Sequence, residues 1–350
     1  MKEILVIAVL ILFFSVMGVC AEQSLNVVTT LPDYAFFAKV IGADRVTVQA
    51  IVRGDQDAHF IRPKPSFATA SRQADVFIET GLDLELWSQT VIDNSGNSKI
   101  RSGQVGYVSA AAGMNLLEKP QTISRAEGGV HIYGNPHITC SPINMKIAAK
   151  NIATGLIKND PEGKEVYLQN LKKLHKEIDE RLFGSKLVDI LGADTLCSLA
   201  ERDGLIPFLQ EQKFEGKPVT DYLGGWMEKM LPLRGTPIVT YHKNWIYFFK
   251  LFGLEEAGNV EPKPGIPPSA KHVTELINLM KERNIRIILA ANYFDEQQIR
   301  AVAARVDAEA VIVPLYVDGA PGTDDYFKLV DFWIDGLLKA AEKKGILNKH

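Results

Sequence analysis

Residues 165–182, EVYLQNLKKLHKEIDERL, decide the overall architecture. Their apolar side chains recur at steps of three and four residues, while the opposite face is charged; the apolar positions are Leu171, Leu174, Ile178 and Leu182. This spacing places one apolar stripe along a helix. Because the helix is long and lies between two regions with a different pattern, the sequence predicts a rigid connecting helix over residues 161–184.

On the N-terminal side of this helix, short valine-rich runs alternate with helical segments. Three runs predict strands: 26–31 (NVVTTL), 46–52 (VTVQAIV) and 75–80 (DVFIET). The segments between them have helical spacing. Such alternation is typical of an α/β unit with a mostly parallel sheet, so we expect one α/β lobe over residues 22–160.

The same alternation resumes after the connecting helix. Residues 236–241 (TPIVTY), 285–291 (IRIILAA) and 310–316 (AVIVPLY) predict strands, and a final helix runs from 326 to 343 with its apolar residues on one side. We therefore expect a second α/β lobe within residues 185–350, and an α/β fold overall.

The N-terminus has the layout of a secretory signal peptide. Lys2 precedes an apolar stretch from Ile4 to Met17, and small residues follow. This stretch is shorter than the ~20 residues that a membrane-spanning helix needs. We expect residues 1–21 to be a signal peptide that is removed on export, with a lipid-modified Cys20 as the second interpretation.

Composition and cysteine content limit the function classes. The chain is 46% hydrophobic and 23% charged, with a formal net charge of -3, and so gives no reason to expect a nucleic-acid partner. After export Cys140 and Cys197 remain. In an oxidising compartment they can form one disulfide, and two separate thiols are the equal alternative.

Four polar side chains stand where α/β proteins collect ligands, near the carboxyl ends of strands. His59 follows the second predicted strand, His242 directly follows residues 236–241, Asp318 follows the last predicted strand, and His137 lies in a loop before a helix. Three imidazoles and a carboxylate satisfy a four-coordinate zinc ion. No compact metal motif is present, so each can also be an ordinary loop residue, and Asp-Gly is a common turn.

These residues lie in motifs that resemble those of a known family, the extracytoplasmic substrate-binding proteins of zinc and manganese ABC importers (metal-binding cluster A-I). The resemblance covers nearly the whole mature sequence. It rests on four stretches: DAHFIRPKPS (57–66), NPHITCSPINMKIAAKNIATGL (135–156), the stretch from Tyr241 to Ile285, and LYVDG (315–319).

The resemblance implies a fold and a ligand set. The fold is two similar α/β lobes joined by a long backbone helix, with a metal ion in the cleft between them. The implied ligands are His59, His137, His242 and Asp318. In the family, a histidine at the third position goes with zinc and a glutamate with Mn²⁺, so His242 favours zinc. Asp324 and Asp325 are nearby alternatives for the fourth ligand.

The chain departs from the family in three places. Arg62 stands where an acidic residue is usual. The separation between His137 and His242 is longer than usual, with the extra residues at about 185–235. We predict that this insertion partly covers the cleft or receives a metal-delivery protein, and a structural subdomain without such a role is the equal alternative. The histidine-rich loop of many zinc members is reduced to His131.

The resemblance implies that the protein is not an enzyme: it captures a divalent ion, zinc above all, outside the cytoplasmic membrane and delivers it to an ABC importer permease. The alternative is a zinc-dependent hydrolase, which would need an open coordination position. Binding of iron or a metal chelate is a third interpretation, and nothing in the sequence calls for an adhesion role. Because ligand histidines must be neutral, we expect affinity to fall at low pH.

Overall fold

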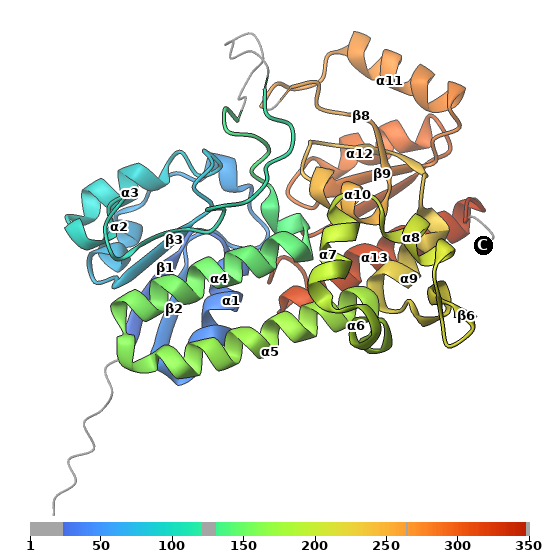
Figure 1. The fold of residues 1–350 in the computed structure, drawn as a ribbon. Coiled ribbons are helices and arrows are strands. Elements are labelled where there is room, and N and C mark those ends of the chain that lie inside the picture. Colours follow the sequence, from blue (N-terminus) through green and yellow to red (C-terminus); the bar gives the residue numbers. More distant parts are fainter. Residues whose placement is uncertain (1–23, 121–130, 264, 348–350) are drawn as a thin grey trace, which may run out of the picture.

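The computed structural model describes residues 24–120, 131–263 and 265–347, which form two α/β lobes (Figure 1). The predicted signal peptide and Cys20 lie outside the described residues. Within the described part of the chain, none of the helices has both the length and the apolar character needed to cross a membrane.

The N-terminal lobe contains a four-stranded sheet in the order β2-β1-β3-β4, and every neighbouring pair is parallel. Its strands are β1 Leu25–Thr29, β2 Val46–Ala50, β3 Val76–Glu79 and β4 Tyr107–Ser109. β2 and β3 lie within the predicted ranges, and β1 begins one residue before the predicted 26–31. β4 is three residues long, too short for an alternating pattern to be visible in the sequence.

The C-terminal lobe repeats this plan with the order β10-β9-β7-β8, again entirely parallel. Its strands are β7 Pro237–Thr240, β8 Glu255–Asn259, β9 Ile287–Ala291 and β10 Glu309–Val313. The central strand β9 is buried along its whole length, as expected for a parallel sheet covered on both faces. The predicted α/β fold with two mostly parallel sheets is confirmed.

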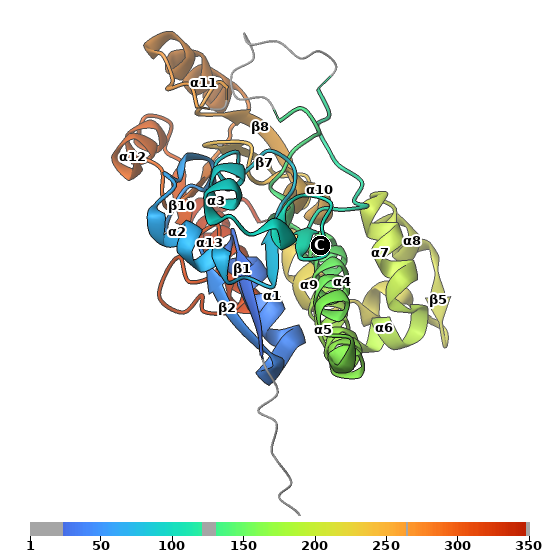
Figure 2. The same ribbon diagram turned by 90° about the vertical axis from the view of Figure 1, so that its left-hand side faces the viewer.

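Helices cover both sheets and fill the space between them (Figures 1 and 2). α1 packs against α4 and α5, and α13 packs against β9 and β10. The principal helices are α1 Pro32–Gly42, α2 Pro65–Arg72, α3 Ser88–Ser95, α4 Pro142–Asn159, α5 Lys164–Phe183, α9 Gly225–Met230, α10 Ile246–Phe252, α11 Ala270–Glu282, α12 Glu296–Ala304 and α13 Tyr326–Lys344.

Helix α5 lies where the connecting helix was predicted and runs from the N-terminal lobe towards the C-terminal one (Figure 1). Leu174, Ile178 and Leu182 of its apolar stripe are buried. The helix contacts α1 and α4 at one end and α9 at the other. At that second end Gly225, with φ +64°, lies so close to Arg181 that a Cβ would overlap the Arg181 carbonyl oxygen.

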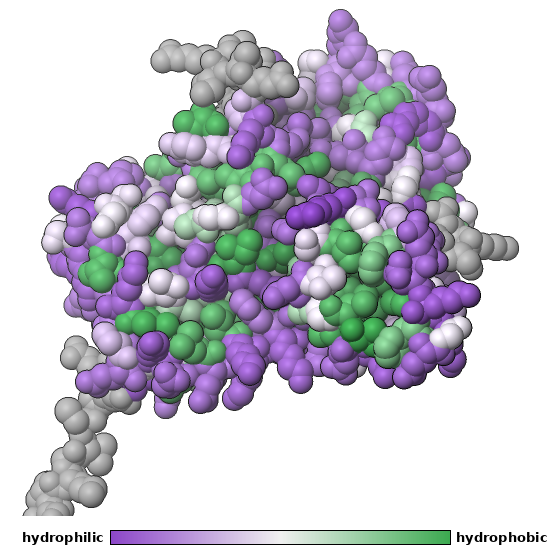
Figure 3. Space-filling model, viewed as in Figure 1, coloured by the Kyte–Doolittle hydropathy of each residue, from purple (hydrophilic) through white to green (hydrophobic). Residues whose placement is uncertain are grey.

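A small helical subdomain follows α5. It consists of α6 Ser185–Leu191, α7 Ala193–Glu201, α8 Leu205–Glu211 and a two-residue antiparallel pair, β5 Lys213–Phe214 and β6 Lys217–Pro218. Helices α6 and α7 pack on α5, and α7 also touches α10. On the face shown in Figure 3, hydrophobic side chains gather over this subdomain, while the rim of the molecule is mostly hydrophilic.

The two cysteines of the described chain are free thiols, so the disulfide alternative is wrong for this structure. Cys140 is buried, in the short 3-10 turn that precedes α4. Cys197, on α7, lies 3.7 Å from Lys146 Nζ and 3.7 Å from Asp179 Oδ1, where a buried ion pair holds it in place. Burial raises the pKa of the Cys197 thiol to about 12.

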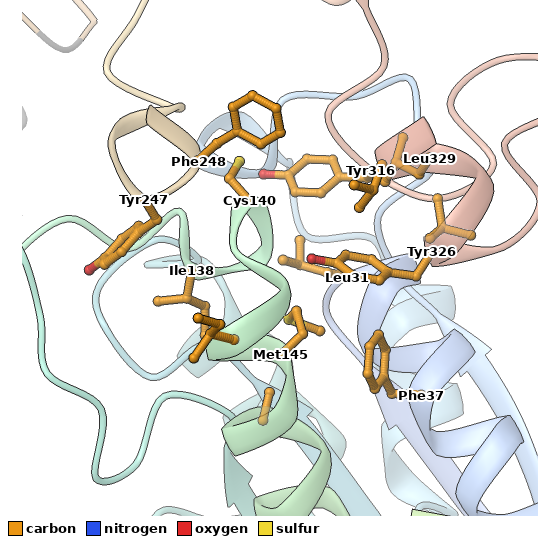
Figure 4. Close-up of a cluster of buried hydrophobic side chains, with 14 of the residues drawn as sticks. Leu31, Phe37, Ile138, Cys140, Met145, Tyr247, Phe248, Tyr316, Tyr326 and Leu329 are labelled. Carbon is orange, nitrogen blue, oxygen red and sulfur yellow. The ribbon is translucent and has the colours of Figure 1, made fainter. Parts of the chain in front are cut away.

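One apolar core passes from lobe to lobe (Figure 4). The residues labelled there come from both halves of the chain: Leu31, Phe37, Ile138, Cys140, Met145, Tyr247, Phe248, Tyr316, Tyr326 and Leu329. Two hydroxyl groups add hydrogen bonds across the lobes. Tyr326 donates to the carbonyl oxygen of Thr139 at 2.7 Å, and Tyr247 to that of Asn135 at 2.7 Å. The lobes are therefore joined by packing as well as by α5.

A buried carboxyl group also links the lobes. Asp33, in the first turn of α1, is fully buried, and its Oδ2 accepts a hydrogen bond from Val317 N–H at 3.3 Å. Its Oδ1 has no hydrogen-bond partner in the described structure. Burial raises the pKa of Asp33 to about 8, although the Val317 N–H acts in the opposite direction.

We expect Asp33→Asn to stabilise the protein progressively as pH rises. Between the ordinary pKa of 3.8 and the folded value of about 8, the folded protein retains a proton that the unfolded chain has lost. The free energy of unfolding of the wild type therefore falls with rising pH, by at most about 1.4 kcal/mol per pH unit. Asparagine keeps an oxygen acceptor and does not titrate.

Urea unfolding over a pH series measures this difference. The gap between Asp33→Asn and wild type should widen towards alkaline pH, whereas Asp44→Asn, at an exposed carboxylate, should show a constant gap. Parallel pH curves for Asp33→Asn and wild type would contradict the prediction.

Candidate metal site

Three of the predicted ligands meet between the lobes. Each of His59, His137 and His242 offers a ring nitrogen within 4.8 Å of those of the other two. Their ring centroids are 5.2 to 5.5 Å apart. His59 lies on a short 3-10 turn in the loop after β2, His137 just before α4, and His242 directly after β7. The sheets thus bring together imidazoles from both lobes.

Each ring is held by an oxygen on its Nδ1 side. The contacts are His59 Nδ1 to Asp57 Oδ1 at 2.6 Å, His137 Nδ1 to Asn135 Oδ1 at 2.9 Å, and His242 Nδ1 to Glu261 Oε2. Such oxygens only accept, so Nδ1 donates and the lone pair lies on Nε2. Histidine ligands of metal ions are typically oriented in this way.

The local sequence explains two of these arrangements. Asp57 and Asn135 each stand two residues before their histidine, and each also accepts a hydrogen bond from the histidine's backbone N–H at 3.0 Å. One oxygen thus fixes both the backbone and the ring. Sequence reasoning missed these residues, although the acidic or amide residue two positions earlier is a visible signal. Glu261 comes from beyond β8 and has no comparable signal.

The Nε2 atom of His137 is the clearest sign of a ligand site. It is buried and has no hydrogen-bond partner among the described residues. Burial lowers the pKa of His137 well below its usual value, and the neighbouring His59 and His242 lower it further. The ring is therefore neutral, which is the form that binds a metal ion.

The charges behind the rings suit a divalent cation. Burial raises the pKa of Asp57, but hydrogen bonds and charge from His59 outweigh it, so that the net pKa is lowered and Asp57 remains a carboxylate. Glu261 supplies a second carboxylate behind His242. Two carboxylates behind the imidazole rings can balance the charge of a divalent ion. The residues present therefore fit a divalent metal ion.

The structure does not bring the fourth predicted ligand to this group. Asp318 is exposed, in a turn with φ +60° closed by a hydrogen bond from its own N–H to the Thr323 carbonyl oxygen. Among the described residues, its carboxylate is not one of the clustered ligand atoms. Asp324 binds Lys328 Nζ at 3.0 Å, and Asp325 caps α13. The turn after β10 thus directs all three aspartates elsewhere.

A fourth imidazole lies next to the group instead. The Nε2 atom of His131 is 3.3 Å from Nε2 of His59, and its ring centroid is 5.3 Å from that of His59 and 6.0 Å from that of His137. Burial, with the neighbouring His59 and His242, lowers the pKa of His131 to about 3. Sequence reasoning noted His131 only as the remnant of a loop.

Two other departures from the family, Arg62 and the insertion, make no hydrogen bond or ring contact with the clustered histidine rings in the described structure. Arg62 is exposed, and nothing in the structure explains why a basic residue stands there. The predicted insertion supplies none of the hydrogen bonds or ring contacts that the described structure gives the clustered histidines.

The loop that carries His59 touches the other lobe through its backbone. A Cβ on Gly54 would overlap the carbonyl oxygen of Val317 and the amide nitrogen of Gly319. The Gly319 turn is itself fixed, because Asn292 Nδ2 donates to the Gly319 carbonyl oxygen at 2.8 Å. Only glycine allows the two loops to approach this closely.

We expect Gly54→Ala to destabilise the protein and to weaken metal binding. Two backbone segments must separate to admit the methyl group, and overpacking of this kind costs about 1–3 kcal/mol. The movement also shifts His59 away from His242. Chemical unfolding and zinc titration measure the two effects. Gly204→Ala is the matched control, because its Cβ would meet only ordinary contacts; equal behaviour of the two variants would contradict the prediction.

Comparisons with known proteins place the chain in one family. Residues 27–181 and 221–340 match the family described as ZnuA, zinc-uptake complex component A, periplasmic. The unmatched residues 182–220 contain the elements from α6 to β6. Relatives include the manganese ABC transporter substrate-binding lipoprotein PsaA of Streptococcus anginosus, 23% identical over 95% of this chain and 98% of that protein. Another is the high-affinity zinc uptake system protein ZnuA of Bacillus subtilis, 24% identical over 82% and 76%.

An iron-binding protein, YfeA of Yersinia pestis, is 24% identical over 91% of this chain and 86% of its own length. A zinc-bound crystal structure of a ZnuA deletion mutant shares the fold, with a TM-score of 0.64, 20% identity, and coverage of 94% of this chain and 100% of that one. So does the manganese-bound periplasmic metal binding protein of Candidatus Liberibacter asiaticus, with a TM-score of 0.63, 18% identity and coverage of 91% and 99%. The chain belongs to the ZnuA family of zinc-uptake components, which are metal-binding proteins of ABC importers and not enzymes, as the sequence motifs predicted.

Proposed function

We propose that this protein captures a divalent metal ion, with zinc as its main substrate, outside the cytoplasmic membrane and delivers it to an ABC importer permease. The observation that carries the proposal is the convergence of three oriented imidazoles, His59, His137 and His242, from two lobes. The relatives' names support a metal ion as substrate, but they include zinc, manganese and iron.

The chemistry of the ligand set favours zinc among these ions. Zinc is commonly bound by histidine nitrogen, with Zn–N distances of about 2.0–2.1 Å. Manganese prefers carboxylate and water oxygen. At this site the carboxylates of Asp57 and Glu261 contact the Nδ1 side of the rings, so they orient ligands and leave nitrogen to face the ion. A zinc-dependent hydrolase finds no support in the comparisons.

The location and the partners belong to the same proposal. Residues 1–21 act as the signal peptide, and a lipid anchor at Cys20 is the alternative; the description of the family as periplasmic and of relatives as lipoproteins supports an extracytoplasmic location. The principal partner is the permease. A metal-delivery protein is a further candidate that would bind at the insertion of about residues 185–235. Nucleic acid is not among the partners.

Metal analysis of the purified chain from residue 22 tests the proposal. We expect one zinc ion per chain and a much higher affinity for zinc than for manganese, measured by competition with a chromophoric chelator. A chain that binds no divalent ion tightly would refute metal capture. A preference for manganese would refute the choice of zinc. Deletion of residues 185–222, the part of the insertion that precedes α9, tests the delivery surface. Zinc transfer from a donor protein should slow while affinity is retained, and unchanged transfer would refute this role.

A further inference from the structure

A cavity separate from the histidine rings lies where α7 of the helical subdomain meets α4 and α10 (Figure 1). Its walls come from the loop after β4, the first turn of α4, the last turn of α7 and helix α10. Contacts between α7 and α10, and between Cys197 on α7 and Lys146 on α4, hold these elements together. The cavity volume is about 250 Å³, below the roughly 300–1,000 Å³ typical of sites for drug-sized ligands, so the cavity suits a smaller molecule.

The side-chain amide of Asn144 is the first sign of a ligand in this cavity. Asn144 lines the cavity from the first turn of α4 and is 7% exposed, and its Nδ2 atom is buried with no hydrogen-bond partner among the described residues. Buried donors are nearly always hydrogen-bonded, and leaving one unpaired costs stability. A ligand with an acceptor oxygen supplies the partner that the protein does not.

The charges around the cavity favour an anion. Lys250 of α10 and Arg202, directly after α7, both line it, and neither forms an ion pair with the residues that the structure describes. Glu201 is the single acidic side chain among the lining residues, so the basic groups outnumber it. The N-terminus of α4 also lies here, and the positive end of a helix dipole attracts negative charge. A carboxylate therefore matches the polar part of the cavity.

The remaining wall is apolar and fixed in place. Leu117, Ile143 and Leu251 contribute hydrocarbon surface. The hydroxyl of Tyr247 accepts a hydrogen bond from the Leu117 N–H at 3.2 Å and donates to the Asn135 carbonyl oxygen at 2.7 Å. A preformed site with apolar walls and a few polar groups is typical of small organic ligands. An organic acid with a hydrocarbon part thus matches this cavity better than an inorganic anion does.

The insertion builds one wall of the cavity. Ser198, Ala200, Glu201 and Arg202 lie within residues 182–220, which the family match leaves out. We propose that the cavity is a binding site for a small organic carboxylate with an apolar part, whose carboxylate is bound by Asn144, Lys250 and Arg202. This site goes beyond the proposed metal capture and does not depend on it. It gives the insertion a ligand-binding role of its own.

Titration calorimetry of the metal-free chain from residue 22 with isovalerate tests this site. We expect saturable one-to-one binding, and much weaker binding of isovaleramide, which has the same shape without the charge. Inorganic phosphate at the same concentration should not displace isovalerate, because it has no apolar part. Absence of saturable binding, equal binding of the amide, or displacement by phosphate would each overturn the proposal.

Two variants locate the binding. Asn144→Leu removes the amide at similar volume and should weaken isovalerate binding at least about 10-fold, the effect of losing one hydrogen bond to a charged group. Lys250→Met keeps the length of an exposed side chain and should weaken binding about 2–5-fold, as for an exposed ion pair. Lys172→Met is the control, at an exposed lysine of α5 outside the cavity, and should bind as wild type does.

Denaturant unfolding of each variant shows that it is folded before its affinity is compared. Wild-type affinity in both Asn144→Leu and Lys250→Met would show that isovalerate binds elsewhere, and the assignment would fall. Because the protein is free of metal throughout, either result leaves the proposed capture of zinc to its own test.

Discussion

Replacement of His242 by alanine is expected to abolish tight zinc binding. His242 is the ring that the C-terminal lobe contributes to the three central imidazoles, and its removal also leaves the partly buried Glu261 without its ring partner. Loss of an outer-shell partner alone typically costs about 10–100-fold in metal affinity, so loss of this ligand should cost more than about 100-fold.

Competition between the protein and a chromophoric chelator measures this loss. His272→Ala serves as the histidine control, and cooperative denaturant unfolding of both metal-free variants shows that each is folded. Zinc affinity close to wild type in His242→Ala would mean that the convergence of rings has no role in binding.

The second large effect concerns stability. Trp333 on α13 is fully buried, meets Trp245 edge to face at 5.3 Å between centroids, and donates from Nε1 to the Pro314 carbonyl oxygen at 2.6 Å. Trp333→Ala leaves a large cavity and an acceptor without its donor. We expect the free energy of unfolding to fall by about 3–5 kcal/mol.

Denaturant unfolding of the metal-free protein measures this change. The neighbouring residue supplies the control: Phe332 is 39% exposed, and Phe332→Ala should change stability by no more than about 0.5 kcal/mol. A loss in Trp333→Ala as small as that in Phe332→Ala would show that the packing between α13 and α10 contributes little.

Much of the fold could be predicted from sequence because it depends on local repetition. The apolar stripe of α5 and the valine-rich runs of β1 to β3 are visible in single segments. Strand β8, EEAGN, has no β-branched residue and becomes a strand only because β7 offers it a parallel partner. Such pairing is a tertiary effect, and a strand that depends on it carries little signal of its own.

The site was predictable in part for the same reason. Strand ends place His59 and His242 near the cleft, and the motifs supplied His137. The residues that orient these rings were missed, and the position of His131 depends on how a loop folds back. Asp318 follows the right strand, yet a left-handed turn directs its carboxylate outward. Residue order specifies which loop carries a side chain, but not where that side chain points.

The apolar core shared by the lobes limits how a permease can recognise the metal-loaded protein. Wide opening would expose rings such as Tyr326 and Tyr247, at a cost on the order of several kcal/mol. The empty and loaded forms should therefore have nearly the same radius of gyration in X-ray scattering. A permease that distinguishes the two forms must therefore sense a change of loop conformation over a few residues at the mouth of the cleft. Release of the ion then proceeds by exchange of its protein ligands while the protein is docked on the permease.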